Sequence, residues 1–134
     1  MLRYIWGFFF GKKPVEFISA NRLEKIYMNP KYVVVDTRPM GEYLDKYIIG
    51  SVNIPQTSFY RQSRKKVHPS QHVVLVCRNG HVATNAYHTL KKRQFRWVRV
   101  LKDGINDLEN TKQYLLVEKN KVPKQITEDK NKKA

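Results

Sequence analysis

The sequence has very little cysteine, because Cys77 is the only one in 134 residues. A single cysteine excludes an internal disulfide framework and a zinc site made of four cysteines. Nothing in the sequence therefore indicates a secreted, oxidised protein, and we expect a reducing compartment. Acidic residues are also few: 11 Asp and Glu stand against 26 Lys and Arg, which gives a formal net charge of +15.

Long apolar runs are absent as well. The N-terminal segment 1–14 is aromatic, basic and free of acids, but its apolar run is far shorter than the roughly 20 residues that a membrane-spanning helix needs. Its composition is compatible with a mitochondrial targeting stretch or an interfacial anchor. We therefore expect a mitochondrial location, or otherwise a cytoplasmic one. The predicted membrane-surface contacts are Trp6, Phe8, Phe9 and Phe10.

The remaining length suits one domain with one hydrophobic core. We place this domain at residues 15–116. The stretch 117–134 is rich in Lys and Asn and has no apolar periodicity, so we predict a basic, unstructured C-terminal tail there.

Strand and helix patterns alternate within the predicted domain. The predicted strands are 32–35, 52–55, 72–76 and 98–101. The predicted helices are 19–27, 42–47, 83–93 and a last one lined by Leu108, Leu115 and Leu116. This alternation predicts an α/β fold with a central, mainly parallel sheet and helices on both faces.

Cys77 follows the apolar strand 72–76 and comes just before a predicted helix. Unpaired N–H groups and the helix dipole favour a thiolate at such a place, which makes Cys77 a candidate nucleophile. Alternatively, Cys77 is a small buried hydrophobic residue of the core. Asp36 also ends a predicted strand, and functional groups of parallel sheets gather at these ends.

Several segments together resemble the rhodanese-homology family of sulfurtransferases, in the family's order and spacing, over about residues 15–116. These segments are Val34-Val35-Asp36-Thr37-Arg38 with Glu42-Tyr43, then 49–55, then Val74-Leu75-Val76-Cys77-Arg78-Asn79-Gly80, and finally Leu101-Lys102-Asp103-Gly104-Ile105. The resemblance implies a three-layer fold and a cysteine that carries sulfane sulfur as a persulfide.

The resemblance also implies roles for particular residues. Cys77 would be the nucleophile, and Asp36 and Arg38 would support the site, unless they form only a structural ion pair. The N–H groups of the following loop would form an anion cradle, made of Arg78, Asn79, Gly80, His81, Val82 and Ala83.

The loop departs from the family pattern in two places. Val82 and Ala83 stand where many active members have Arg followed by Ser or Thr, so a cation and a hydroxyl donor are missing. Arg78 or His81 could replace the positive charge, or Arg78 could point to solvent. Further departures are Tyr47, Asp103 and Leu108, which replace a usual His, Gly and Trp.

Two other kinds of site are disfavoured. Phosphatases built on a similar scaffold use a Cys-x5-Arg loop, in which the arginine binds phosphate through two hydrogen bonds, but this chain has Ala83 at the position of that arginine. A metal site from Cys77, His81 and His88 lacks tight ligand spacing, so we predict neither a metal nor a cofactor.

Basic clusters favour a polyanionic partner or an acidic protein surface, although they could also be a solvated face. Their members are Arg61, Arg64, Lys65, Lys66, Lys91, Lys92, Arg93, Arg96 and Arg99. We interpret the chain as a non-catalytic or weakly catalytic accessory subunit of a larger protein or ribonucleoprotein assembly, such as a mitochondrial ribosome or an inner-membrane complex. The alternative is an active sulfurtransferase that works through a Cys77 persulfide.

Overall fold

The computed structural model describes residues 14–119. The expected N-terminal anchor, with its four aromatic contacts, and nearly all of the expected C-terminal tail lie outside these residues. Within the described part of the chain, no helix is both long and apolar enough to cross a membrane.

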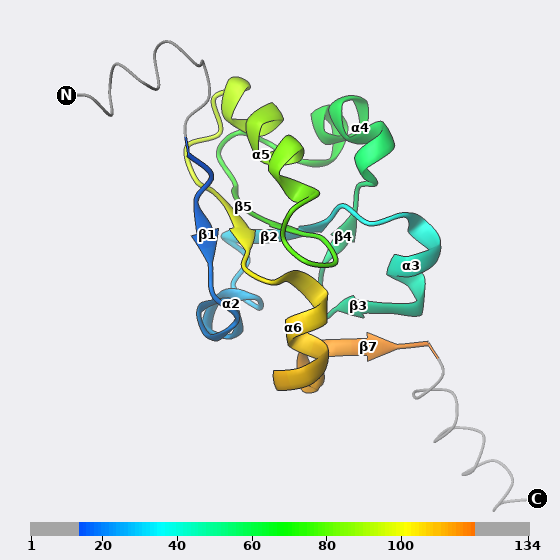
Figure 1. Ribbon diagram of the computed structural model, residues 1–134. Coiled ribbons are helices and arrows are strands. Elements are labelled where there is room, and N and C mark those ends of the chain that lie inside the picture. Colours follow the sequence, from blue (N-terminus) through cyan, green and yellow to red (C-terminus); the bar gives the residue numbers. More distant parts are fainter. Residues whose placement is uncertain (1–13, 120–134) are drawn as a thin grey trace, which may run out of the picture.

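A five-stranded parallel sheet forms the centre of the domain (Figure 1). Its strands are β1 (Phe17–Ile18), β2 (Tyr32–Asp36), β4 (Val52–Asn53), β5 (His72–Val76) and β6 (Val98–Leu101). They lie in the order β1-β6-β5-β2-β4, and every neighbouring pair is parallel. A separate antiparallel pair joins β3 (Lys46–Ile48) to β7 (Leu116–Glu118).

Helices cover both faces of the sheet. On one face lie α4 (Phe59–Lys66) and α5 (Ala83–Lys92), and on the other lie α2 (Ala20–Ile26) and α6 (Gly104–Thr111). Successive side chains of β5 point to opposite faces, as the pleat of a strand requires, so the strand is buried on both sides. The three-layer α/β fold with a mainly parallel sheet is therefore confirmed.

Most predicted elements lie where the patterns placed them. Ser19 caps α2 by accepting a hydrogen bond from the N–H of Arg22 at 3.1 Å, and β5 has the predicted bounds. The predicted helix 42–47 begins earlier, as α3 (Met40–Asp45), and its last two residues belong to β3. Strand β1 and helix α4 were not predicted, because β1 has two residues and α4 is strongly basic.

The predicted last helix is wrong in its second half. Leu108 lies on α6 as expected, but Leu115 ends a short 3₁₀ turn (Gln113–Leu115) and Leu116 begins β7. Strand β7 thus extends into the stretch predicted as tail, because Val117 and Glu118 pair with β3. Pairing with a distant strand overrides the weak helical pattern.

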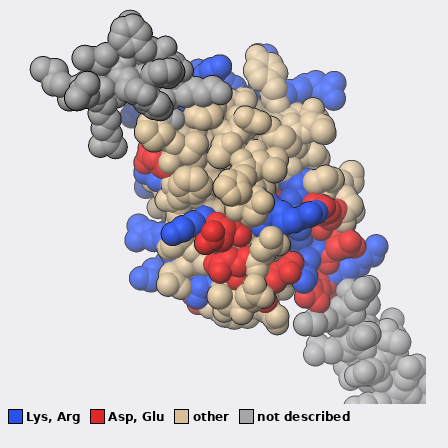
Figure 2. Space-filling model, viewed as in Figure 1, with Lys and Arg blue, Asp and Glu red and all other residues tan. Residues whose placement is uncertain are grey.

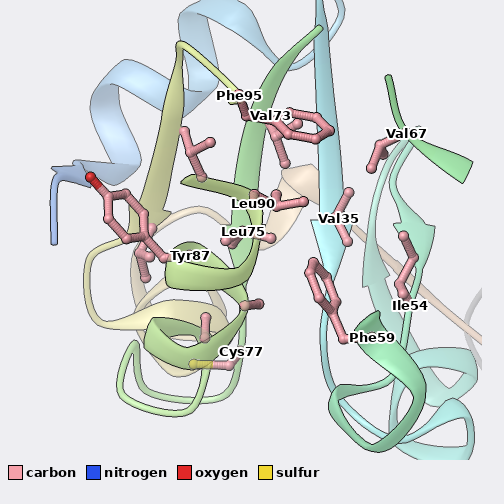
Figure 3. Packing of buried hydrophobic residues seen from close by; sticks show 14 residues of the cluster. Val35, Ile54, Phe59, Val67, Val73, Leu75, Cys77, Tyr87, Leu90 and Phe95 are labelled. Carbon is pink, nitrogen blue, oxygen red and sulfur yellow. The ribbon is translucent and has the colours of Figure 1, made fainter. Parts of the chain in front are cut away.

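Cys77 belongs to the larger of the two sides of the core, the side covered by α4 and α5. Figure 3 shows Val73, Leu75 and Cys77 following one another along this side, with Phe59 across from Cys77. The thiol therefore lies at the carboxyl end of the central strand, where a parallel sheet opens to a possible site.

Candidate active site around Cys77

The loop after β5 curls back over the thiol of Cys77. The Cys77 side chain is 2% exposed, and its Sγ accepts a hydrogen bond from the N–H of Gly80 at 3.0 Å. Gly80 has φ +93°, a backbone conformation that residues with a side chain rarely adopt. A Cβ at this position would also lie 3.3 Å from the backbone oxygen of Leu101, a tight contact that adds to the preference for glycine set by the positive φ.

The first turn of α6 holds the loop backbone in place. The N–H of Ile105 donates to the carbonyl of Cys77 and that of Asn106 to the carbonyl of Arg78, both at 3.0 Å. Gly104 comes directly before these donors, with φ +59°, and a Cβ there would lie 2.3 Å from the Cys77 carbonyl oxygen. The helix can dock against the loop only because residue 104 lacks a side chain.

A pocket of about 430 Å³ opens beside the thiol. Five lining residues were given a role from the sequence: the predicted nucleophile Cys77, the supporting residue Arg38, and the loop residues Arg78, Asn79 and Val82. Sequence reasoning gave no site role to the other lining residues: Thr37, Pro39, Glu42, Pro55, Gln56 and Thr57. Several of these residues, including Glu42 and Pro55, lie inside the motifs quoted above, so the motifs could have been used to predict the wall of the pocket.

Asp36 and Arg38 form a buried ion pair. Both carboxylate oxygens of Asp36 accept from the guanidinium of Arg38 at 2.9 to 3.1 Å, and the second guanidinium nitrogen also donates to the carbonyl of Lys46. Asp36 does not line the pocket, whereas Arg38 forms part of its wall. The pair therefore fixes the end of β2 against β3 and leaves Arg38 with its charge balanced.

The side chain of Arg78 is 61% exposed, and it also has a partner. Its guanidinium pairs with the carboxylate of Glu42 from α3, and both residues line the pocket. Each Lys or Arg in the pocket wall formed by the described residues is thus paired with a carboxylate. Val82, at the loop position where many family members have Arg, is exposed and apolar.

Tyr43 anchors the helix that carries Glu42. Its hydroxyl donates to the carbonyl of Ser51 at 2.6 Å, and its ring stacks on Tyr47 with centroids 4.9 Å apart. Burial raises the pKa of the Tyr43 hydroxyl above its ordinary value, and the nearby charge of Asp36 adds to this. Tyr47 packs in this stack and does not line the pocket.

Two residues of the predicted cradle, His81 and Ala83, do not line the pocket beside the thiol. His81 is exposed, lies outside the pocket wall, and donates its N–H to the side-chain oxygen of Asn79 at 3.0 Å. Ala83 is buried at the start of α5. Among residues 14–119, no three His, Cys, Asp or Glu side chains are placed together to hold a metal ion.

Comparison with known proteins gives a consistent family assignment. The model of the rhodanese-like domain matches residues 19–111. A rhodanese-related protein from Thermoplasma volcanium shares 22% identity and a TM-score of 0.67, with 76% of this chain and 97% of that chain covered. A protein from Bacillus halodurans shares 18% identity and a TM-score of 0.64, with 82% of each chain covered. No curated protein matches significantly.

A third similar structure is EanB in complex with ergothioneine, at 14% identity and a TM-score of 0.65. The match covers 74% of this chain but only 27% of EanB. Another EanB structure holds ergothioneine covalently linked with a persulfide cysteine. At these identities the solved structures show a shared fold.

Proposed function

Because the chain belongs to the rhodanese-like domain family, we propose that Cys77 accepts a sulfane sulfur and carries it as a persulfide. One observation carries the proposal: Cys77 lines a pocket while the Gly80 N–H donates to its Sγ. A preorganised N–H donor stabilises negative charge that develops on sulfur. The intact loop and the docking of α6 behind it support the same role.

The proposed reaction has two displacement steps. The Cys77 thiolate attacks the terminal sulfur of a persulfide donor, so that a new S–S bond forms on Cys77 and the donor leaves as a thiolate. A thiophilic acceptor then attacks the terminal sulfur on Cys77, takes it, and releases the Cys77 thiolate. No net oxidation occurs, because one sulfane sulfur passes from donor to acceptor.

The charge balance of the pocket supports a donor other than a small dianion. Arg38 is paired with Asp36, and Arg78 is paired with Glu42, so neither offers an unbalanced charge to thiosulfate. Val82 supplies apolar surface at the same pocket. We therefore propose as the preferred donor a persulfide that carries at most one negative charge, or a protein-bound persulfide, and expect only weak activity with thiosulfate.

Persulfide formation can be tested directly. Purified full-length protein is incubated with an amide-capped cysteine persulfide, separated from it and analysed by mass spectrometry. We expect one added sulfur on the peptide that contains Cys77, and its release as thiocyanate when cyanide is added. A chain that takes up no sulfur, or keeps it when cyanide is present, would contradict the proposal.

Removing the carboxylate at the pocket should change the donor preference. In Glu42→Gln the Arg78 charge is unbalanced, so we expect turnover with thiosulfate to rise about fivefold relative to the amide-capped persulfide. The measurement is kcat/KM for each donor. The matched control is Glu109→Gln, which removes a carboxylate paired with Lys46 outside the pocket. Equal changes in both variants would show that only the net charge of the protein matters.

The second candidate function is the accessory subunit expected from the sequence, and the formal net charge of +15 favours it. A module of this kind would keep the fold, dispense with efficient catalysis, and bind a larger assembly through its basic residues. A mitochondrial location and membrane-surface contact of the N-terminal segment belong to this proposal. Sizing and sedimentation of the native protein at physiological salt test it, because migration as a lone monomer would exclude a stable assembly.

A further inference from the structure

Acidic residues are distributed very unevenly in this domain. Between Asp45 and Asp103 the chain contains no Asp or Glu, although this stretch supplies most of the central sheet and both helices of one face. All acidic residues among the described ones therefore come from the segments before and after it. In Figure 2 most of the visible carboxylates gather in the lower half of the view, near α3 and α6, where basic side chains lie among them, and further basic side chains lie along the upper edge.

Helices α4 and α5 together form a basic face, which we call the α4–α5 surface. The two helices meet where the Arg93 guanidinium donates to the hydroxyl of Ser63 at 2.9 Å. The surface has these basic residues: Arg61, Arg64, Lys65, Lys66, Lys91, Lys92 and Arg93. Within residues 14–119, none of them forms an ion pair with a carboxylate.

Cations without a carboxylate partner also occur elsewhere in residues 14–119, for example Arg22 and Lys25 of α2, but the α4–α5 surface brings seven of them together at two adjacent helices. Other exposed or half-buried cations, such as Lys46, Arg78 and Lys112, have carboxylate partners. Bringing so many like charges together is unfavourable for the isolated domain, and a polyanion would relieve the repulsion. The α4–α5 surface is therefore suited to binding a polyanion that neutralises its positive charge.

Tyr60 adds an aromatic ring to this basic surface. It is 65% exposed, and one helical turn separates it from Arg64, so ring and guanidinium lie on the same side of α4. Tyr60 is the one exposed large hydrophobic residue that α4 and α5 contribute. Insertion into a bilayer needs a broad apolar face, which these two helices do not offer.

We propose that the α4–α5 surface binds single-stranded nucleic acid. The basic residues would contact successive phosphates, and Tyr60 would stack on an unpaired base, which a duplex does not present. This proposal gives the accessory-subunit candidate a partner of defined chemistry. It is independent of sulfur transfer, because none of the surface residues lines the Cys77 pocket.

Salt titration of matched charge variants tests the phosphate contacts. The full chain is titrated with a labelled oligouridylate of about 15 nucleotides, and fluorescence anisotropy gives the affinity at several salt concentrations. We expect Arg61→Gln/Arg64→Gln to weaken binding about tenfold and to reduce the salt slope by about 1.4. The control Arg22→Gln/Lys25→Gln removes the same charge from exposed positions of α2, on the opposite face, and should leave the slope nearly unchanged. The basic residues outside 14–119 are identical in all variants.

Removing the ring tests the stacking contact. Tyr60→Ala should weaken binding of the single strand about fivefold or more while binding of duplex RNA stays unchanged. Tyr114→Ala is the control, because Tyr114 is similarly exposed, at 60%, but lies outside the α4–α5 surface.

Several outcomes would overturn the proposal. These are a flat salt response, equal losses in the α4 and α2 variants, an unchanged affinity of Tyr60→Ala for the single strand, or a stronger affinity for vesicles of anionic lipid than for the oligonucleotide. Persulfide formation on Cys77 is measured separately, so that failure of nucleic-acid binding and failure of sulfur transfer remain distinguishable.

Discussion

Gly104→Ala is expected to lower the free energy of unfolding by about 3 kcal/mol or more, enough to prevent stable folding of many domains of this size. The added Cβ would lie 2.3 Å from the carbonyl oxygen of Cys77 and 2.6 Å from that of Arg78. Neither carbonyl can move freely, because each accepts a hydrogen bond from the first turn of α6. Relief of the clash would therefore separate the helix from the loop.

Substitutions at two other glycines serve as controls that separate the effect of the steric clash from the effect of the positive φ. An added Cβ at Gly50 meets nothing within 4 Å of it, but φ is +78°, so Gly50→Ala should cost about 1 kcal/mol from conformation alone. Gly41 lies in α3 with neither problem, so Gly41→Ala should be neutral or stabilise by up to about 1 kcal/mol.

Urea unfolding of the three variants measures the differences. If Gly104→Ala unfolds at the same urea concentration as Gly50→Ala, the close approach of α6 to the Cys77 loop is not rigid. If Gly104→Ala yields only insoluble protein while Gly50→Ala folds, the result also supports a destabilising clash at residue 104.

The strands that surround the site were predictable because their patterns are local. The β-branched run before Asp36 and the apolar run before Cys77 are continuous, as strands buried on both faces must be. Two parallel strands of this kind place Asp36 and the end of β5 side by side, and the structure pairs Asp36 with Val76. The fold and the position of the thiol therefore followed from the order of short apolar runs and turns.

The wall of the pocket could not be predicted in the same way. The pairing of Glu42 with Arg78 joins residues 36 positions apart and depends on how α3 packs beside the loop. The contact of α6 with the Cys77 carbonyl depends on a left-handed turn at Asp103, which has φ +62°. Asp tolerates this conformation better than most residues, which is why the replacement of the family's glycine keeps the turn. Sequence patterns record which residues are apolar, but they do not record such distant contacts.

The basic residues of α4 were recognised in the sequence, but the helix that carries them was not. Its helical structure was not predicted, because only Phe59 and Ser63 of this helix are buried. A helix of eight residues is marginal by itself and forms here through packing of Phe59 against the core. Tertiary packing, rather than helix propensity, thus arranges the basic side chains on one face.

Cys77→Ser is expected to abolish persulfide formation and reduce sulfur transfer to the uncatalysed background, a loss of about a thousandfold or more. A serine oxygen does not accept sulfane sulfur, and the chain has no second cysteine to replace Cys77. The serine hydroxyl can still accept the hydrogen bond from the Gly80 N–H, so the loop should keep its shape. Burial of a hydroxyl in this apolar cluster should cost about 1 to 2 kcal/mol of stability.

The decisive comparison is between the folded wild type, the same protein in urea, and Cys77→Ser. Each is loaded with the amide-capped persulfide, and the added sulfur is measured over time by mass spectrometry. A folded site that uses the Gly80 N–H and the pocket should load faster than the unfolded chain, whose thiol is merely exposed. Equal rates would show that the pocket contributes nothing to the chemistry, and sulfur transfer by Cys77→Ser at the wild-type rate would show that the thiol is not used. Urea unfolding of Cys77→Ser, measured as for the glycine variants, shows whether the variant is folded.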